Sequence, residues 1–444
     1  MSRIPIHRRA ALRVVAGAVA LGTLAAVSGC SAGGGGSTEL DTKADVTLTW
    51  WTGQADQAET ILEGLAREYE KAHPNVTIKV SSGAPSTEDL LQKLSASFAG
   101  GNYPDISYAF GSWASRLEAS KRTLDITKQV SDPAVDWEGF SAAARETAQP
   151  TGKRTIGFPA VVDNISLIYN TKLFADAGVA VPTKDWTWDD FRAAAKRLTV
   201  PSKQQYGYAY SVSGSEETTW QFWPHLWQRG GEVLSADQRT ATFDSAAGVE
   251  ALTYLRDMAR TDRSVYLDQT DTKYGQLFAG GRIAMMTSGP WQLNALKIAK
   301  TDYGVTVLPG TDGNHETVSG PDLWTLFDHK DANRAHWAYE FTKWLTDPAQ
   351  DLKWNVAYGN LPLRESETTS AEFKAQVKAL PGLDVMAANS ANAKHARPTV
   401  AGYNGLSEAI GDQISAVLQG KGDPATALKT AATKADEALA GTGP

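Results

Sequence analysis

The strongest constraint on the fold of this chain is an alternation of strand-like and helix-like segments that begins near residue 45. Residues 45–51 are rich in β-branched and aromatic side chains and predict a strand, and residues 56–71 carry apolar side chains at helical spacing. A strand pattern at 76–80, a helical segment at 90–98 and a strand-like run at 105–110 follow. This β-α-β-α-β order predicts a parallel or mixed sheet with helices on its faces.

Later segments repeat the alternation. Thr187 is suited to cap a helix that runs through Leu198, and residues 303–308 predict a strand. Near the end, Asp423 is expected to cap a helix whose first turn holds Pro424. The chain has 444 residues, which corresponds to two or three domains of ordinary size.

The N-terminus has the pattern of an export signal. Residues 1–13 carry four arginines and no acid, and residues 14–27 form a 14-residue apolar run. A helix of that length rises only about 21 Å, which is too short for a hydrocarbon core of about 30 Å. We therefore expect residues 1–29 to be a signal peptide. The pair Arg8-Arg9 is compatible with twin-arginine export, and the general secretory route stays open as well.

The one cysteine of the chain, Cys30, follows the small residues at the end of this apolar run. The segment around it resembles a bacterial lipobox, whose cysteine receives a lipid and becomes the mature N-terminus. We expect residues 30–44, which include Gly33 to Gly36, to form a flexible tether between the membrane and a globular body.

Charge and composition exclude several classes of protein. With 50 acidic and 43 basic residues the chain has a formal charge of −7, which gives no support for nucleic-acid binding. A single cysteine rules out an intrachain disulfide and makes a cysteine-based zinc site untenable. No P-loop, dinucleotide fingerprint, nucleophile elbow or H-E-x-x-H motif is present. The seven histidines are scattered, and we expect His329 and His336 at the surface. We expect no catalytic residue, no metal and no cofactor.

Fourteen tryptophans are an unusual number for such a chain, and they must lie either in packed cores or against a ligand. Trp337 and Trp344 fall on one face of a predicted helix at 335–345 and are expected in a core. Trp223 and Trp227 are also expected in a core.

Four segments resemble one family of proteins. They are IGFPAVVDNISLIYNTKLFADAG at 156–178, GRIAMMTSGPW at 281–291, YGVTVLP at 303–309 and RPTVAGY at 397–403. In this order they resemble the extracytoplasmic solute-binding proteins of ABC importers, in the branch that contains the maltose-binding protein. The resemblance covers nearly all of the chain after the export signal.

The resemblance implies a bilobal α/β fold, with two α/β lobes joined by a hinge and a ligand cleft between them. Lobe 1 would comprise residues 45–160 and 303–347, and lobe 2 would comprise residues 161–302 and 348–440. Ligands of open α/β sheets lie beyond the carboxyl ends of the strands, which agrees with a cleft of this kind.

The resemblance also implies a set of ligand contacts. In lobe 1, Gln54 follows the first strand, and Phe110 and Ser112 end the third. Family members often carry an acid where this chain has Ser112, which puts a maltodextrin-like contact pattern in doubt. Asp163 aligns with a ligand-contacting acid, and Asn164 follows it. A carboxylate accepts hydrogen bonds from neighbouring sugar hydroxyls, and a hinge or turn residue is the alternative role of Asp163.

The remaining candidates come from later segments. Trp220 and Trp291 align with aromatic residues that stack on sugars, and Glu217 precedes Trp220 by three positions. Asp322, Arg397 and Tyr403 are further candidates, with a structural ion pair as the alternative role of Arg397.

These observations predict a lipid-anchored receptor at the outer face of the membrane that captures a carbohydrate and delivers it to ABC permease subunits. A separate ATPase would supply the energy, because the chain has no nucleotide motif. Two alternatives stay open: the same fold binding a glycerophosphodiester or another polar solute, and a surface glycosidase using Asp163 and Glu217.

Overall fold

The computed structural model describes residues 37–84 and 87–441. The expected signal peptide, the Arg8-Arg9 pair and the lipidation residue Cys30 lie outside the described residues. No helix among residues 37–84 and 87–441 combines the length and the apolar character needed to cross a membrane.

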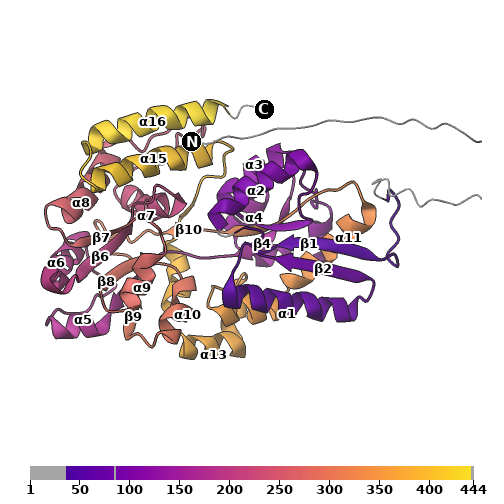
Figure 1. Cartoon of the computed structure of the whole chain (residues 1–444), viewed down its shortest axis with the longest axis horizontal. Coiled ribbons are helices and arrows are strands. Elements are labelled where there is room, and N and C mark those ends of the chain that lie inside the picture. Colours follow the sequence, from indigo (N-terminus) through magenta and orange to yellow (C-terminus); the bar gives the residue numbers. More distant parts are fainter. Residues whose placement is uncertain (1–36, 85–86, 442–444) are drawn as a thin grey trace, which may run out of the picture. The chain divides into compact units, whose positions relative to one another are not determined.

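The first sheet has the strand order β2-β1-β3-β11-β4 and is mixed (Figure 1). Strand β1 pairs in parallel with β2 and β3, whereas β11 runs antiparallel to both β3 and β4. The expected parallel or mixed sheet is thus confirmed. Its strands are β1 (Val46–Trp51), β2 (Val76–Ser81), β3 (Ile106–Phe110), β4 (Gly157–Val161) and β11 (Asp322–Leu326).

Helices cover this sheet and share one aromatic core with it. Trp50 of β1 meets Trp324 and Phe341 edge-on at ring-centroid distances of 5.1 and 5.2 Å. Trp337 is buried in this core, as expected, and Trp344 is half-buried against it. The helices are α1 (Asp56–Ala72), α2 (Thr87–Gly100), α3 (Ala114–Ala119), α4 (Ala142–Ala148) and α11 (Ala332–Leu345).

The second sheet has the strand order β7-β6-β8-β5-β9. Strand β6 runs parallel to β7 and β8, and β5 runs antiparallel to β8 and β9. The sequence analysis assigned residues 303–347 to lobe 1. Strand β9 pairs with β5, however, so residues 303–306 belong to the second sheet. The strands are β5 (Ser166–Asn170), β6 (Tyr206–Ser211), β7 (Val265–Asp268), β8 (Ile283–Ser288) and β9 (Tyr303–Thr306).

Helices also surround the second sheet, and the sequence signals for two of them are confirmed. Thr187 and Asp190 form a reciprocal capping box at the start of α6, and Pro424 begins α16. Trp223 and Trp227 are buried in this core, as expected. The helices are α5 (Thr171–Asp176), α6 (Trp188–Leu198), α7 (Glu216–Trp227), α8 (Ala246–Arg260), α9 (Lys273–Ala279), α10 (Trp291–Ile298), α15 (Tyr403–Leu418) and α16 (Pro424–Gly441).

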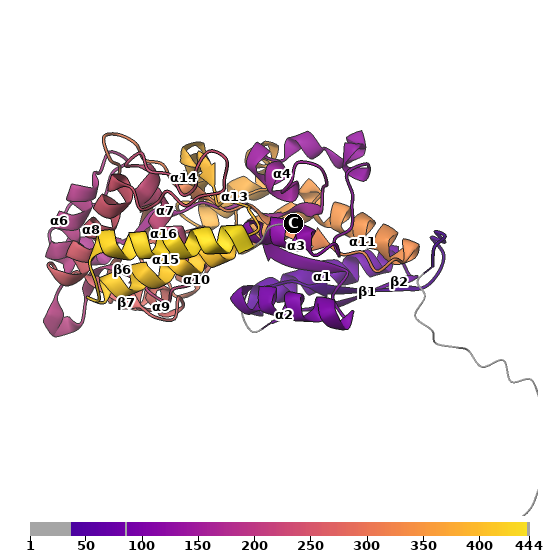
Figure 2. The ribbon, with the colours of Figure 1, turned by 90° about the horizontal axis from the view of Figure 1, so that it is seen from above.

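The chain passes between the two sheets more than once. It leaves the first sheet after β4, forms most of the second, and returns to the first with β11. A short parallel pair, β10 (Val318–Ser319) and β12 (His395–Ala396), joins two of the crossing segments. After α11 the chain forms α12 (Pro348–Asp351), α13 (Ala371–Ala379) and α14 (Leu383–Asn389). It ends in α15 and α16, which run side by side (Figure 2).

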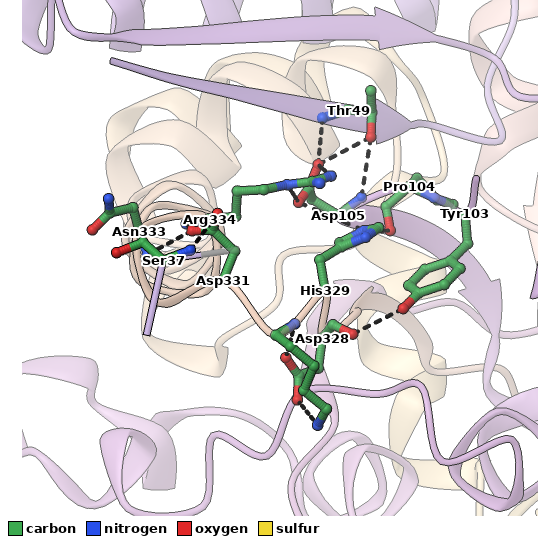
Figure 3. A network of polar contacts seen from close by, with 11 residues as sticks. Ser37, Thr49, Tyr103, Pro104, Asp105, Asp328, His329, Asp331, Asn333 and Arg334 are labelled. Atoms are coloured by element: carbon green, nitrogen blue, oxygen red, sulfur yellow. Dashed lines mark hydrogen bonds and ion pairs between the residues drawn. The ribbon is translucent and has the colours of Figure 1, made fainter. Parts of the chain in front are cut away.

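A buried ion pair fastens α11 to the first sheet (Figure 3). Asp105 is 1% exposed and accepts hydrogen bonds from Nε and Nη2 of Arg334 at 2.8 and 2.9 Å. It also accepts one from the backbone N–H of Thr49 at 2.7 Å. The His329 ring lies 3.8 Å from Asp105 and stacks on Tyr103 at 4.3 Å. The expected surface position of His329 is therefore wrong: its side chain is 10% exposed, because the ring is enclosed between these two partners.

The described part of the expected tether, residues 37–44, is bonded to the same region. The backbone carbonyl of Ser37 accepts a hydrogen bond from Ala332 N–H at 2.7 Å, and Asp41 N–H donates to Asn333 Oδ1 at 2.6 Å. The side-chain amide of Asn75 donates to the carbonyl of Ala44 at 3.0 Å. These residues therefore belong to the folded body and differ from the free tether that the glycine-rich sequence predicts.

Candidate functional site

One cavity of about 380 Å³ is lined by residues from both sheets. Strand ends and the loops after them supply most of its wall, as expected for ligand sites of open α/β sheets. The first lobe contributes Gln54, Thr87, Tyr108, Phe110, Val161 and Asp322. The second lobe contributes Glu216, Glu217, Trp220, Asp271, Tyr274 and Trp291. The segments between the lobes and after α11 add Asp163, Tyr358, Asn360 and Arg397.

Arg397 lies between two carboxylates and two aromatic rings. Its Nη2 is 2.9 Å from Asp322 Oδ1, and its Nη1 is 3.4 Å from Glu216 Oε1. The guanidinium carbon lies 4.5 Å from the ring centre of Trp220 and 5.2 Å from that of Phe110. Burial alone would lower the pKa of Arg397, but Asp322 and Glu216 outweigh it and raise that pKa. Arg397 is thus a permanently charged link between the lobes.

Further hydrogen bonds hold the two carboxylates that pair with Arg397. Asp322 accepts from the Tyr108 hydroxyl and, at 3.1 Å, from the backbone N–H of Gly111. Glu216 accepts from the Ser407 hydroxyl at 2.7 Å and from the Tyr403 hydroxyl at 3.0 Å. Burial raises the pKa of both carboxyls, and Arg397 partly offsets that rise.

Glu217 and Asp271 form a second acidic pair on the lobe 2 side. Glu217 accepts hydrogen bonds from Gln221 at 2.8 Å and from the Tyr274 hydroxyl at 3.0 Å. Burial, together with the nearby charge of Asp271, raises the pKa of Glu217 to about 7. Asp271 is held by hydroxyls, with Ser215 Oγ at 2.7 Å. Neutral groups therefore bind both carboxylates.

Asp163 is a polar group of the cavity whose hydrogen bonding is incomplete. The residue is 9% exposed, and no described group donates a hydrogen bond to its Oδ1. Burial and the charge of Asp322 raise its pKa well above the usual value, against the opposing effect of Arg397. A buried acceptor without a partner costs free energy, so this atom is placed to receive a donor from a bound molecule.

Two tryptophans bring flat faces to the cavity. Trp220 is 5% exposed, and its indole N–H lacks a partner among the described residues. Trp291 begins α10 and is only half-buried. Both positions depend on glycines. A Cβ at Gly320 would lie 2.4 Å from Trp220 Cη2 and 2.5 Å from Asp163 Oδ1, and one at Gly289 would lie 1.9 Å from Trp291 Cζ3.

Eight of the residues predicted as ligand contacts line this cavity. They are Gln54, Phe110, Asp163, Glu217, Trp220, Trp291, Asp322 and Arg397.

Three predicted residues lie behind the wall instead. Ser112 is 1% exposed in the turn that follows β3. Asn164 is turned away and donates to the carbonyl of Met386 at 2.8 Å. Tyr403 is fully buried and reaches the site only through its hydrogen bond to Glu216. These three residues do not line the cavity, although residues next to them in the sequence or in the structure do.

Sequence reasoning missed several lining residues: Thr87, Tyr108, Val161, Glu216, Asp271, Tyr274, Tyr358 and Asn360. Tyr108 precedes Phe110 by two positions in a strand, so both side chains point to the same face. This spacing was a usable signal. Asp271 and Tyr274 follow β7, and the loop beyond a strand end is where ligand contacts are expected.

Among the described residues, no group of three or more His, Cys, Asp or Glu side chains has the arrangement needed to hold a metal ion. The cavity lining presents carboxyl groups, hydroxyls and indole rings.

Comparison with known proteins identifies what the chain resembles. A family model described as bacterial extracellular solute-binding protein matches residues 64–381. An ABC substrate-binding protein from Listeria monocytogenes, in complex with cycloalternan, is 23% identical, with a TM-score of 0.80 over 89% of this chain and 99% of that one. UgpB from Mycobacterium tuberculosis, in complex with glycerophosphocholine, is 16% identical, with a TM-score of 0.80 over 89% of this chain and 98% of that one.

A sequence relative adds a further likeness. An uncharacterized lipoprotein from the oleD 5′ region of Streptomyces antibioticus is 26% identical over 347 residues, which are 72% of this chain and 71% of the relative. The two structural likenesses establish the fold as the bilobal arrangement of α/β lobes expected from the sequence.

Proposed function

Because this chain belongs to the family of bacterial extracellular solute-binding proteins, we propose that it is a lipid-anchored receptor that captures a mono- or oligosaccharide for an ABC importer. Family membership makes it an extracytoplasmic protein of solute transport. The ligand would enter the cavity, hinge closure of the lobes would trap it, and the closed form would engage the permease. A separate ATPase would supply the energy.

The observation that carries this proposal is the combination of indole faces and hydrogen-bonding carboxylates in one cavity. Trp291 presents a half-buried ring, and Asp163 has an acceptor oxygen without a described donor. A sugar has an apolar C–H face that stacks on an indole and hydroxyls that donate to carboxylates. Burying about 100 Å² of that face contributes about 2–3 kcal/mol. One such contact on Trp291, together with charge-assisted hydrogen bonds, supports micromolar affinity, about −8 kcal/mol.

Lipid anchoring is part of the proposal and rests on Cys30 and on the Streptomyces lipoprotein relative. Mass spectrometry of the mature N-terminal peptide tests it. A diacylated or triacylated Cys30 supports the anchor, and replacement Cys30→Ala should release the protein from the membrane fraction. A mature protein that begins elsewhere and lacks lipid contradicts it.

The likeness to UgpB makes a glycerophosphodiester the second candidate ligand. A phosphate group needs a cation that is free to bind it. Among the described residues that line the cavity, Arg397 is the only Arg, Lys or His, and it already pairs with Asp322 and Glu216. This arrangement favours a carbohydrate over a phosphodiester.

A glycosidase would need two carboxylates across the ligand, and Asp163 and Glu217 do line one cavity. Release of a chromophore from nitrophenyl glycosides, lost in Asp163→Ala or Glu217→Ala, would replace the receptor proposal by this one. The family argues for transport instead.

A thermal-shift screen against mono- and oligosaccharides tests the proposal directly, because a ligand that binds only the folded state raises the melting temperature. We expect at least one saccharide to raise it and Trp291→Ala to abolish the rise. Trp186→Ala is the matched control, since Trp186 is half-buried but does not line the cavity. A screen in which glycerophosphocholine shifts the protein and no saccharide does would overturn the proposal.

A further inference from the structure

The charges that line the cavity do not balance. The described lining residues include five carboxylates and one cation, Arg397. The carboxylates are Asp163, Glu216, Glu217, Asp271 and Asp322. Burial raises the pKa values of Asp163, Glu216, Glu217 and Asp322, so negative charge on these groups is unfavourable until a proton or a bound cation compensates it.

Arg397 is already fully engaged by two of the five carboxylates. It bonds to Asp322 at 2.9 Å and to Glu216 at 3.4 Å, and its side chain is 8% exposed. Hydroxyls and a backbone N–H complete the contacts of these two carboxylates. Arg397, Asp322 and Glu216 therefore form a compensated set with little capacity left for a ligand.

None of the other three carboxyl groups forms an ion pair with a described residue. Glu217 and Asp271 are bound by an amide and by hydroxyls, and Asp163 Oδ1 has no donor at all. Negative charge on Glu217 disfavours ionisation of Asp163, and negative charge on Asp271 disfavours ionisation of Glu217. Each is an acidic group at the cavity wall that a bound cation could stabilise in its ionised form.

The chemistry of a neutral sugar does not correct this imbalance, because hydroxyls donate hydrogen bonds but bring no charge. A protonated amine brings both, with up to three N–H donors in one compact group. Indole faces add to the attraction, since a cation over the ring of a tryptophan is favoured. The guanidinium carbon of Arg397 already lies 4.5 Å from the ring centre of Trp220. The half-buried ring of Trp291 is therefore the one left for the ligand.

We propose that the ligand of this cavity is a saccharide carrying a protonated amine, and that Asp163 and Glu217 bind the ammonium group. The inference rests on the proposed carbohydrate function and narrows it to one class of sugar. The uncharged rings of the ligand would pack on Trp291, and its hydroxyls would reach the remaining polar groups of the wall.

Titration calorimetry and thermal shift at pH 7 test the inference with sugar pairs that differ in one group. Glucose is compared with 2-amino-2-deoxyglucose and with 6-amino-6-deoxyglucose. Maltose is compared with derivatives that carry an amine in place of a hydroxyl at the same ring positions. We expect at least one aminated member to bind tenfold or more tightly than its hydroxyl parent. N-acetylation of that member, which removes the charge, should abolish the advantage.

Two isosteric variants assign the effect to residues. Asp163→Asn and Glu217→Gln should each reduce the advantage of the aminated sugar over its hydroxyl parent at least tenfold. Asp185→Asn, which removes an exposed carboxylate outside the cavity, is the matched control and should leave the advantage unchanged. The unliganded melting temperature of each variant confirms that it folds.

The outcomes separate this inference from the proposed function. Parent sugars that bind as tightly as aminated ones overturn the amine assignment and leave the carbohydrate receptor standing. Glycerophosphocholine binding, with no saccharide binding, overturns both. An amine preference that survives in both Asp163→Asn and Glu217→Gln overturns the assigned residues and with them the inference.

Discussion

Asp105 and Asp163 are both buried carboxylates, and their surroundings are opposite. Asp105 receives two hydrogen bonds from Arg334 and two from Thr49, all between 2.7 and 3.0 Å. Asp163 lines a cavity, has an oxygen without a described donor, and lies near other carboxylates. A charge that holds the fold together is matched by fixed partners, whereas a charge that serves binding is left for the ligand to match.

The largest effect on stability is expected from removing the ion pair between Asp105 and Arg334. Asp105→Ala leaves the guanidinium of Arg334 and the N–H of Thr49 without their acceptor. Because the Arg334 side chain is 32% exposed, we expect a loss at the lower end for buried pairs, about 3 kcal/mol of unfolding free energy. Urea denaturation measures it. A loss below about 1 kcal/mol would mean that Asp105 contributes no more than a surface ion pair does.

A smaller effect is expected from pH at the acidic site. The pKa of Glu217 is raised from 4.5 to about 7 by burial and by Asp271, with Glu216 acting in the same direction. The folded state therefore holds this proton more tightly than the unfolded state. The stability from Glu217 is fully present below about pH 4.5 and is lost as the pH rises through 7. We expect a decrease of about 2 kcal/mol, allowing for partial exposure of the side chain.

Denaturation of the unliganded protein between pH 5 and 8 checks this prediction. Glu217→Gln should flatten the dependence by that amount, whereas Asp185→Asn should leave it in place. Other cavity carboxylates with raised pKa values, including Asp163, add slopes of the same sign. An identical slope in Glu217→Gln and in the unchanged protein would contradict the assignment.

The smallest effect concerns Asp163 itself. Burial and the charge of Asp322 disfavour the ionised form of Asp163, and asparagine cannot ionise, so we expect Asp163→Asn to add about 1 kcal/mol to the unfolding free energy of the unliganded protein. Asp105→Asn should instead lower the unfolding free energy. The same replacement of Asp by Asn is thus expected to change stability in opposite directions at the two positions. Parallel urea titrations of the two variants measure the contrast. Destabilisation by Asp163→Asn would show that Asp163 has a structural partner.

Sequence patterns predicted the main elements because they depend on local chemistry. The expected strand at 45–51 corresponds to Val46–Trp51, and the expected helix after Thr187 corresponds to Trp188–Leu198. The strand at 303–308 was also expected, yet its place in the second sheet was not. A pattern of β-branched residues predicts a strand but carries no information on its hydrogen-bonding neighbours.

The sequence predicted which segments of the chain contribute to the candidate site better than it predicted which side chains line the cavity. Asp163 lines the cavity, whereas its neighbour Asn164 bonds to the carbonyl of Met386 on the other side. In extended backbone, adjacent side chains point to opposite faces, so one of two neighbouring polar residues is necessarily turned away. Tyr403 shows a different limit, since it acts on the site through Glu216 and not by contact.

By itself, the amino-acid sequence determined the alternation of strands and helices, the excess of acidic over basic residues and the supply of tryptophans, because each is a local or summed property of the chain. Only the tertiary structure decided which charges meet. Arg397 is 75 residues from Asp322 and 181 from Glu216, yet it bonds to both, and Asp163 is left without such a partner. Pairing between distant residues depends on how two sheets and their crossing segments pack, which no short stretch of sequence encodes.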